Sequence, residues 1–196
     1  MATGNITGII LAGGRARRMG GQDKGLIQLA RKPMIEYVIN AIDPQVDAII
    51  INANRNQADY EKYGFPVVAD QIEGYCGPLA GMASGLQAAK TPFVVTVPCD
   101  SPLIPDDLVQ KLFSTLQDKD AEICTPLSNG RLQPVFTLMK SELLSSMLDF
   151  LNNGERKIDK WFEKHRLAIA DFSEQPETFI NINSAEELAA IELKLK

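Results

Sequence analysis

Short apolar runs of strand length alternate with longer amphipathic segments along most of this chain. The predicted strands are 6–11, 48–52, 66–69, 93–97 and 121–125, followed by 134–139 and 167–170. The predicted helices are 34–42, 57–63, 78–89 and 106–116. Such alternation favours a mostly parallel sheet with helices on both faces and right-handed crossovers. We therefore expect an α/β fold, a three-layer doubly wound sheet of Rossmann-like type.

The length of 196 residues indicates a single domain, since one hydrophobic core supports roughly 100–200 residues. We find no internal repeat, low-complexity tract or linker. The stretch 126–134, PLSNGRLQP, is predicted to be a turn-rich connection to a less regular C-terminal third.

Polar residues follow several of the predicted strands at their carboxyl ends, where ligands bind in open α/β sheets. Asn52 ends the second strand, Asp70 follows the third and Asp100 follows the fourth. A glycine-rich loop follows the first strand. Asn54 follows Asn52 after one alanine, so the sequence predicts a site in which this amide pair and two carboxylates lie opposite the loop.

The loop after the first strand combines four glycines with a concentration of positive charge. The glycines are Gly13, Gly14, Gly20 and Gly21; segment 15–32 holds Arg15, Arg17, Arg18, Lys24, Arg31 and Lys32 against the single acid Asp23. Backbone amides and cations at such a loop favour an anion site, although turn glycines and a solvated basic face are the structural alternative. No G-x-G-x-x-G is present, and Lys24 lacks the sequence neighbours of a P-loop lysine.

Individual residues of this site allow a functional and a structural interpretation. Arg18 and Lys24 are the best candidates to touch phosphate, whereas Arg15 and Arg17 are expected to be solvated. Asp100 is suited to Mg²⁺, which takes one or two carboxylates plus substrate phosphates, but it could also be a turn residue before Ser101-Pro102. The same two interpretations hold for Asp70, and Asn52 could cap a segment or hold a base or ribose.

Composition narrows the class of protein. The net charge of −5 argues against a general nucleic-acid binder. Three cysteines without C-x-x-C spacing favour a reducing compartment over a disulfide framework or zinc site. The N-terminus has no signal-peptide pattern, and no apolar run reaches the roughly 18 residues of a membrane span. We expect a cytoplasmic protein without nucleic-acid or membrane partners.

Other conspicuous residues are predicted to be structural. Ser184 and Glu187 fit a capping box that opens the last helix. Trp161 and Phe162 are expected in the core. His165 has no paired nucleophile in the sequence and is predicted to be a surface residue.

The loop LAGGRARRMGGQDKGL, with Lys-Pro-Met following it, closely resembles the signature L-A-G-G-x-S/A-x-R-M-G-x-D-K. That signature belongs to the MobA-type nucleotidyltransferases, the molybdenum cofactor guanylyltransferases. Further stretches resemble the same family in order: INANR at 51–55, VVAD at 67–70, GPLAGM at 77–82, VPCDSPLIP at 97–105 and NINSAEEL at 181–188. The resemblance covers nearly the whole chain; Ala16 stands where serine is also frequent.

The resemblance implies a doubly wound nucleotidyltransferase fold and a Mg²⁺-dependent reaction. GTP would give GMP to the phosphate of molybdopterin bearing molybdenum, with release of pyrophosphate and formation of the guanine dinucleotide cofactor. By this similarity, GTP would be held by Leu11, Ala12, Gly13, Lys24, Asn52, Asp70 and Asp100. Arg18, Lys24 and Asp100 would be catalytic, and Asp100 would carry the metal.

The resemblance also implies an acceptor side. Arg156 in the stretch Gly154-Glu155-Arg156-Lys157, together with Asn181 and Asn183, would lie near the pterin. The nucleotide-binding half would be about 1–100 and the acceptor-binding half about 101–196 of one domain, 1–196. Transient contacts with molybdenum-insertion proteins and molybdoenzyme chaperones are further expectations of this kind.

Two other classes of function stay open on the sequence alone. One is a related nucleotidyltransferase that uses CTP on molybdopterin, or a sugar-phosphate or isoprenoid-precursor transferase. The other is a GTP-binding regulatory or scaffold protein without turnover. The Gly13-Gly14 pair favours a guanine nucleotide and so argues against the related transferases. Asp100 argues against a protein without turnover.

Overall fold

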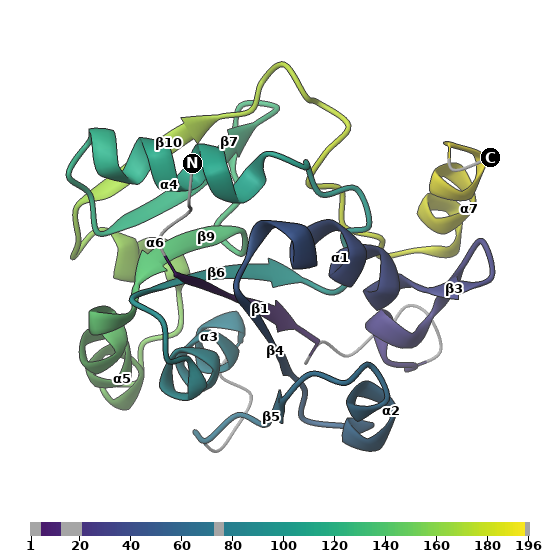
Figure 1. The fold of residues 1–196 in the computed structure, drawn as a ribbon, viewed down its shortest axis with the longest axis horizontal. Helices are drawn as coiled ribbons and strands as arrows, with labels where there is room; N and C mark the ends of the chain where they lie inside the picture. The colour runs from purple at the N-terminus through teal and green to yellow at the C-terminus, as the bar shows by residue number, and fades with distance from the viewer. Residues whose placement is uncertain (1–4, 13–20, 73–76, 195–196) are drawn as a thin grey trace.

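One mixed sheet forms the centre of the computed structural model, which describes residues 5–12, 21–72 and 77–194 (Figure 1). Its strands are β1 (Ile6–Leu11), β4 (Ala48–Asn52), β5 (Val67–Val68), β6 (Phe93–Pro98), β7 (Ile123–Ser128), β8 (Arg131–Leu132), β9 (Thr137–Lys140) and β10 (Leu167–Asp171). Their order is β10-β7-β9-β6-β1-β4-β5, with β8 paired to β7. A separate two-stranded sheet joins β2 (Gln28–Leu29) to β3 (Lys32–Pro33).

Helices connect and flank these strands. They are α1 (Met34–Ile42), α2 (Gln57–Glu61), α3 (Pro78–Ala88), α4 (Leu108–Asp118), α5 (Leu144–Asn152), α6 (Ile158–Phe162) and α7 (Ala185–Lys194), with short 3₁₀ turns η2 (Lys24–Leu26), η3 (Asp43–Gln45) and η4 (Ser141–Leu143). The predicted α/β class and mostly parallel pairing are confirmed, because β1 pairs in parallel with both β4 and β6. In the described sheet, β9 and β8 run antiparallel to their neighbours.

The prediction for 126–134 is partly wrong, because β7 continues to Ser128 and β8 follows at Arg131–Leu132. The two strands are joined by Asn129-Gly130, whose φ angles are +50° and +69°. Positive φ at both central residues is what a two-residue hairpin turn of type I′ requires, and Asn-Gly is the favoured pair. The stretch is therefore a hairpin rather than a plain connection.

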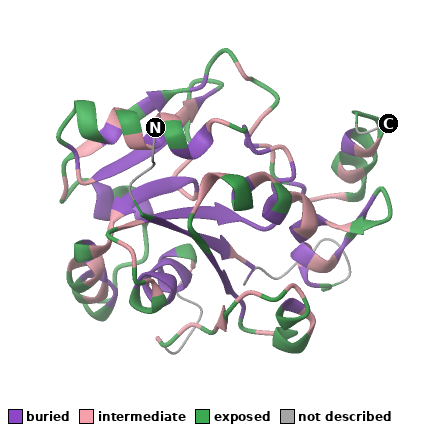
Figure 2. Cartoon of the chain, in the orientation of Figure 1, coloured by how far each residue is buried: buried purple, intermediate pink, exposed green. Residues whose placement is uncertain are grey.

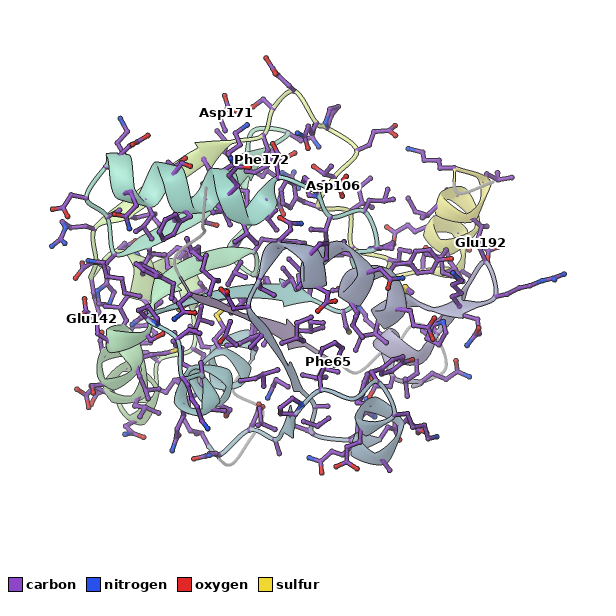
Figure 3. The ribbon with its side chains drawn as sticks, viewed as in Figure 1. Phe65, Asp106, Glu142, Asp171, Phe172 and Glu192 are labelled. Carbon is purple, nitrogen blue, oxygen red and sulfur yellow. The ribbon has the colours of Figure 1, made fainter. Side chains whose placement is uncertain are left out.

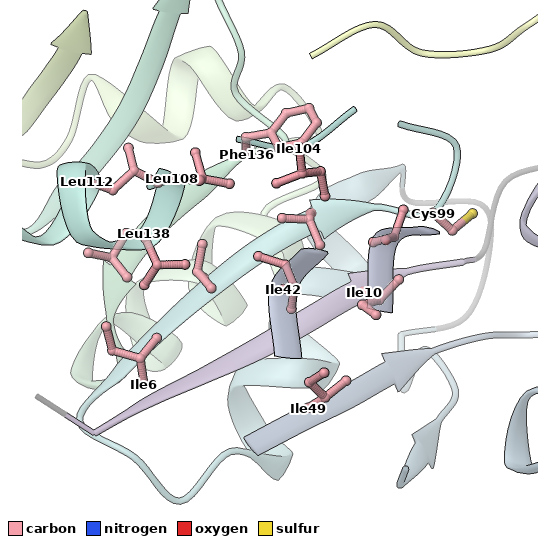
Figure 4. Packing of buried hydrophobic residues seen from close by; sticks show 14 of the residues in the cluster. Ile6, Ile10, Ile42, Ile49, Cys99, Ile104, Leu108, Leu112, Phe136 and Leu138 are labelled. Carbon is pink, nitrogen blue, oxygen red and sulfur yellow. The ribbon is translucent and has the colours of Figure 1, made fainter. Parts of the chain in front are cut away.

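The two faces of the sheet carry separate apolar cores. Ile6 and Ile10 of β1 point to the face covered by α1 and α4, where they meet Ile42, Leu108 and Leu112 (Figure 4). Ile9, one residue out of phase, packs on the other face with residues of α3, α5 and α6. Because successive side chains of a strand point to opposite faces, the same strands contribute to both apolar cores. The sheet between the two cores is buried (Figure 2).

α3 approaches β1 unusually closely because Gly85 has no side chain. A Cβ atom at Gly85 would lie 2.4 Å from Cδ1 of Ile9 and 2.7 Å from its Cγ2. The helix therefore lies against the central strand at a distance that only a glycine permits.

The C-terminal segment packs against the hairpin of β2 and β3 through a small third core of Ile27, Leu29, Met34, Ile182 and Ile191. Glu192 of α7 reaches this hairpin, and its carboxylate accepts a hydrogen bond from the Ala30 amide at 2.8 Å (Figure 3). The predicted capping box is confirmed: Ser184 Oγ accepts from the Glu187 amide, and the Glu187 carboxylate accepts from the Ser184 amide.

The environment of His165 differs from the prediction. Trp161 and Phe162 are buried as expected, but the His165 side chain packs against the Trp161 ring with centroids 4.8 Å apart. Its Nε2 lies 2.9 Å from Ser146 Oγ, and burial lowers the pKa of the imidazole. The prediction of a surface histidine is wrong, because the turn after α6 directs the ring back onto α5.

Strands from both predicted halves, 1–100 and 101–196, pair within the same central sheet. The division into a nucleotide-binding and an acceptor-binding half stays a prediction. Across the described ranges, every helix is too short or too polar to cross a membrane.

The close approach of α3 to β1 gives a test of the packing. We expect Gly85→Ala to lower the free energy of unfolding by about 1–3 kcal/mol, because the added methyl group overpacks the contact with Ile9. Without this contact, alanine would stabilise the helix by about 1 kcal/mol relative to glycine. A decrease in the free energy of unfolding would therefore indicate overpacking against Ile9. Urea denaturation measures it, with the exposed Gln87→Ala of the same helix as control. An unchanged or raised stability would contradict the close packing.

Candidate active site

A cavity of about 200 Å³ opens at the carboxyl ends of β1, β4 and β6. It is lined by Leu11, Lys24, Asn52, Asn54, Asp70, Gly77, Pro78, Gly81, Pro98, Cys99, Asp100, Val135 and Asn181. The structure thus brings together the strand-end residues that the sequence places far apart. This is the edge at which open α/β sheets bind their ligands.

Strand register fixes the relative positions of these residues. Leu11 pairs with Asn52 on one side and with Pro98 on the other. Beyond the last paired residues, the Ala12 amide donates to the Asn52 carbonyl at 2.8 Å, and the Cys99 amide donates to the Leu11 carbonyl at 3.1 Å. The start of the glycine-rich loop and the segment before Asp100 are therefore held side by side.

Lys24 and Asp100 both line the cavity and form an ion pair, with 2.7 Å between Nζ and Oδ2. Their side chains are only 18% and 10% exposed, so water screens this pair less than it screens a surface pair. Lys24 Nζ also donates to Asn183 Oδ1 at 2.6 Å, and the Ile182 amide donates to the Asp100 carbonyl at 2.9 Å. A cation and a carboxylate from segments 76 residues apart are thus fixed side by side.

Asp70 is held between two asparagines of the neighbouring strand end. Asn52 Nδ2 donates to Asp70 Oδ1 at 2.9 Å, and Asn54 Nδ2 donates to Oδ2 at 2.8 Å. Asn54 Oδ1 in turn accepts from the Asp70 amide at 2.7 Å. These bonds join the loops after β4 and β5 and give Asn52 a defined orientation on the cavity wall.

The N-terminal part of α3 also lines the cavity, next to Asn52. Gly77 precedes the helix with φ of +67°, and Pro78 occupies its first turn, where a missing N–H costs nothing. Deeper in the helix, a Cβ at Gly81 would lie 2.3 Å from Asn52 Oδ1 and 3.0 Å from Leu11 Cδ2. Gly81 therefore leaves the space that the Asn52 amide fills.

Gly81 is a site residue that the sequence reasoning missed. Its signal was present, because Gly81 and Gly85 are four residues apart and so share one face of the predicted helix 78–89. Asp23 and its partners were missed as well. Its carboxylate accepts from the Tyr60 hydroxyl at 2.6 Å and from Asn56 Nδ2 at 3.4 Å. Burial raises the pKa of the Asp23 carboxyl, and the bond from Tyr60 opposes that shift.

The residues predicted on the acceptor side occupy two different places. Asn181 lines the cavity and accepts a hydrogen bond from the Ser101 hydroxyl, while Asn183 accepts from Lys24. Arg156 lies in the connection between α5 and α6, where its Nη1 donates to the Leu151 and Glu155 carbonyls at 2.6 Å. Its predicted role at the pterin stays a prediction.

Several predicted site residues lie outside the described residues. These are Gly13, Gly14, Arg15, Arg17, Arg18 and Gly20 of the loop. Ala12, the last described residue before them, is buried, and Leu11 lines the cavity.

Among the described residues, no group of three or more histidine, cysteine, aspartate or glutamate side chains is arranged to hold a metal ion. The acid that lines the cavity beside Lys24 is Asp100, which is 7% exposed. One carboxylate of this kind, completed by substrate phosphates, matches the way in which proteins hold Mg²⁺.

Comparisons with known proteins identify the family of this chain. The family model of the MobA-like NTP transferase domain matches residues 8–169. A molybdenum cofactor guanylyltransferase of Shewanella sediminis is 50% identical over 182 residues, covering 93% of each chain. The enzyme of the same name from Shewanella halifaxensis is 49% identical over 185 residues, covering 94% of this chain and 92% of its own.

Solved structures share the fold at low sequence identity. Molybdopterin-guanine dinucleotide biosynthesis protein A from Archaeoglobus fulgidus superposes with a TM-score of 0.81 at 21% identity, covering 96% of this chain and 98% of its own. A CMP:2-keto-3-deoxy-manno-octonic acid synthetase complexed with CTP gives 0.77 at 11% identity, with 97% and 98% covered. The matched family model and the two relatives near 50% identity show that this chain belongs to the MobA-like NTP transferase family, with the molybdenum cofactor guanylyltransferases, and is a nucleotidyltransferase.

Proposed function

We propose that this chain transfers GMP from GTP to the phosphate of molybdenum-bearing molybdopterin. The carrying observation is the Lys24–Asp100 pair in the strand-end cavity, because a cation beside a carboxylate suited to Mg²⁺ would favour the binding of a triphosphate. The named relatives at about 50% identity support the choice of nucleotide and acceptor.

In the proposed reaction, an oxygen of the acceptor phosphate attacks the α-phosphorus of GTP in line. The new bond is a phosphoanhydride between pterin phosphate and GMP, and the α–β bridging bond breaks as its electron pair leaves with pyrophosphate. No side-chain nucleophile is required, because the acceptor itself attacks. The protein contributes positioning and neutralisation of the charge that spreads over the phosphoryl oxygens.

Lys24 is the described residue best placed for this neutralisation. Its ammonium group has three donors, of which Asp100 and Asn183 take two. Among the described residues the third donor has no hydrogen-bond partner, so it can donate to a phosphate oxygen in the cavity that Lys24 lines. We also propose Arg18 as a phosphate ligand and catalytic cation, because the loop that holds it resembles the family signature.

Asp100 would hold Mg²⁺ together with the substrate phosphates, since its buried carboxylate fits the oxygen ligands that this ion prefers. Bound there, the ion supplies positive charge that stabilises negative charge on the phosphate oxygens. Lys24 keeps the carboxylate oriented toward the cavity through the ion pair at 2.7 Å.

The nucleoside would lie against Leu11, Ala12, Gly13, Asn52 and Asp70. Asn52 and Asp70 present a polar wall whose orientation is fixed by their mutual hydrogen bond at 2.9 Å. A pocket that hydrogen-bonds guanine rejects cytosine strongly, because its own polar groups would be left unpaired.

The acceptor would approach from the side of Asn181 and Asn183. The proposed role of Arg156 at the pterin rests on the family resemblance, since Arg156 is not among the described residues that line this cavity. Asn181 lines the same cavity as the nucleotide residues, which permits the two phosphates to meet. Transient contacts with molybdenum-insertion proteins and molybdoenzyme chaperones, which would supply and receive the cofactor in the cytoplasm, complete the proposal.

The decisive assay incubates the protein with each labelled NTP, Mg²⁺ and molybdenum-bearing molybdopterin, and detects pyrophosphate. We expect release with GTP and a product that contains both GMP and pterin. Turnover with CTP but not GTP would overturn the choice of nucleotide. Binding of GTP without turnover of any NTP would instead favour a regulatory or scaffold protein.

Removing either member of the central ion pair should cost turnover rather than folding. We expect Lys24→Ala and Asp100→Ala each to lower kcat/KM by a factor on the order of 10²–10³, the range for one preorganised charged group. Lys62→Ala, which removes an exposed ion pair with Asp59, is the control. Near-normal turnover by Lys24→Ala or Asp100→Ala would contradict the role of that residue.

Gly81→Ala should weaken nucleotide binding by displacing the Asn52 amide, since the added methyl group would lie 2.3 Å from Asn52 Oδ1. We expect KM for GTP to rise by about tenfold or more, because displacements of about 1 Å in a positioning group are costly. Steady-state kinetics measure this, and circular dichroism checks that α3 stays intact. An unchanged KM in a folded variant would show that Asn52 does not hold the nucleotide.

A further inference from the structure

A buried hydrogen-bond cluster lies directly behind Lys24. Asp23, the residue before it, is 5% exposed and accepts bonds from Tyr60 at 2.6 Å and from Asn56 at 3.4 Å. Tyr60 belongs to α2, and Asn56 immediately precedes that helix. None of these three residues is among the described residues that line the cavity.

The residue after Lys24 is fixed to the same helix. A Cβ at Gly25 would lie 2.8 Å from the Tyr60 hydroxyl and 3.3 Å from Cys99 Cβ. The turn η2 is therefore held between α2 and the end of β6. Lys24 is thus flanked by Asp23, which accepts a hydrogen bond from the Tyr60 hydroxyl, and by Gly25, whose missing side chain leaves room for that hydroxyl.

Stability alone does not explain such a buried polar cluster. Burial of a carboxylate costs free energy unless hydrogen bonds satisfy it, and apolar groups of similar volume often pack at least as well. Asn56 has a φ of +50°, a left-handed conformation that asparagine adopts more readily than other residues with side chains. Directional hydrogen bonds do provide what apolar packing does not, namely one defined position for the chain at Lys24.

The position of the backbone at Lys24 decides what its ammonium group reaches. Two of the three donors are directed at Asp100 and Asn183, at 2.7 and 2.6 Å. The direction of the third follows from those two bonds and from the place of the Lys24 main chain. A shift of η2 would therefore move the donor that remains for a phosphate.

We propose that Asp23, held by Tyr60 and Asn56, is a positioning residue that sets Lys24 for contact with the nucleotide phosphates. This inference rests on the proposed function, in which Lys24 binds those phosphates. Asp23 itself touches no substrate and acts through its neighbour.

A double-mutant cycle between Tyr60→Phe and Lys24→Ala tests this positioning. Tyr60→Phe removes the hydroxyl group and keeps the ring that fills the core. KM for GTP and kcat are measured for wild type, both single variants and the double variant, together with urea denaturation of each. Tyr63→Phe, which removes a hydroxyl three residues further along, is the matched control.

We expect Tyr60→Phe to raise KM for GTP by about tenfold when Lys24 is present, and by less than about twofold in the Lys24→Ala background. Asp23→Asn, which removes the charge and the acceptor for Asn56, should show the same dependence on Lys24. Tyr63→Phe should leave both kinetic constants unchanged.

Equal effects of Tyr60→Phe in both backgrounds would overturn the inference, as would a loss of stability with unchanged KM. Those results would mean that the cluster only supports the fold. Failure of the proposed function gives a different pattern, because wild type would then not turn over GTP, or Lys24→Ala would leave its kinetics intact.

Discussion

The parallel pairing of β1 with β4 on one side and with β6 on the other is the constraint on which the site depends. It places the chain after Leu11, Asn52 and Pro98 at one edge of the sheet, within hydrogen-bond distance of one another. Two loops and a carboxylate that are distant in sequence thereby share one cavity. Everything that the site residues do follows from this alignment, because side chains on loops need a rigid scaffold to hold them in place.

Around this scaffold, polar side chains are held by hydrogen bonds and ion pairs to other polar side chains. Asp70 is held by Asn52 and Asn54, and Asp100 by Lys24, while the cluster behind Lys24 holds the base of the loop. Groups fixed before the substrate arrives do not have to reorganise when charge moves in the reaction. The α3 glycines contribute in another way, by letting a helix approach the sheet closely enough to form a wall of the cavity.

The sequence predicted the fold well because its signals were local. Alternating apolar strands and amphipathic helices are legible from periodicity, and the capping box at Ser184 is a short-range pattern. The prediction was weaker at 126–134, where Asn129-Gly130 forms a hairpin turn. It was also weaker at His165, because no local pattern reveals that its ring packs against Trp161. Because ligands bind at the carboxyl ends of the strands in open α/β sheets, the sequence also predicted that Asn52, Asp70 and Asp100 lie close together.

By itself, the sequence determined the α/β class, the cationic glycine-rich loop and the family to which the chain belongs. These properties depend on residue type, order and spacing along the chain. Only the tertiary structure decided that Lys24 pairs with Asp100, that Gly81 makes room for Asn52, and that Asp23 is bound to Tyr60. Those contacts join residues from different elements, and their distances follow from how the helices pack on the sheet, which periodicity and spacing leave undetermined.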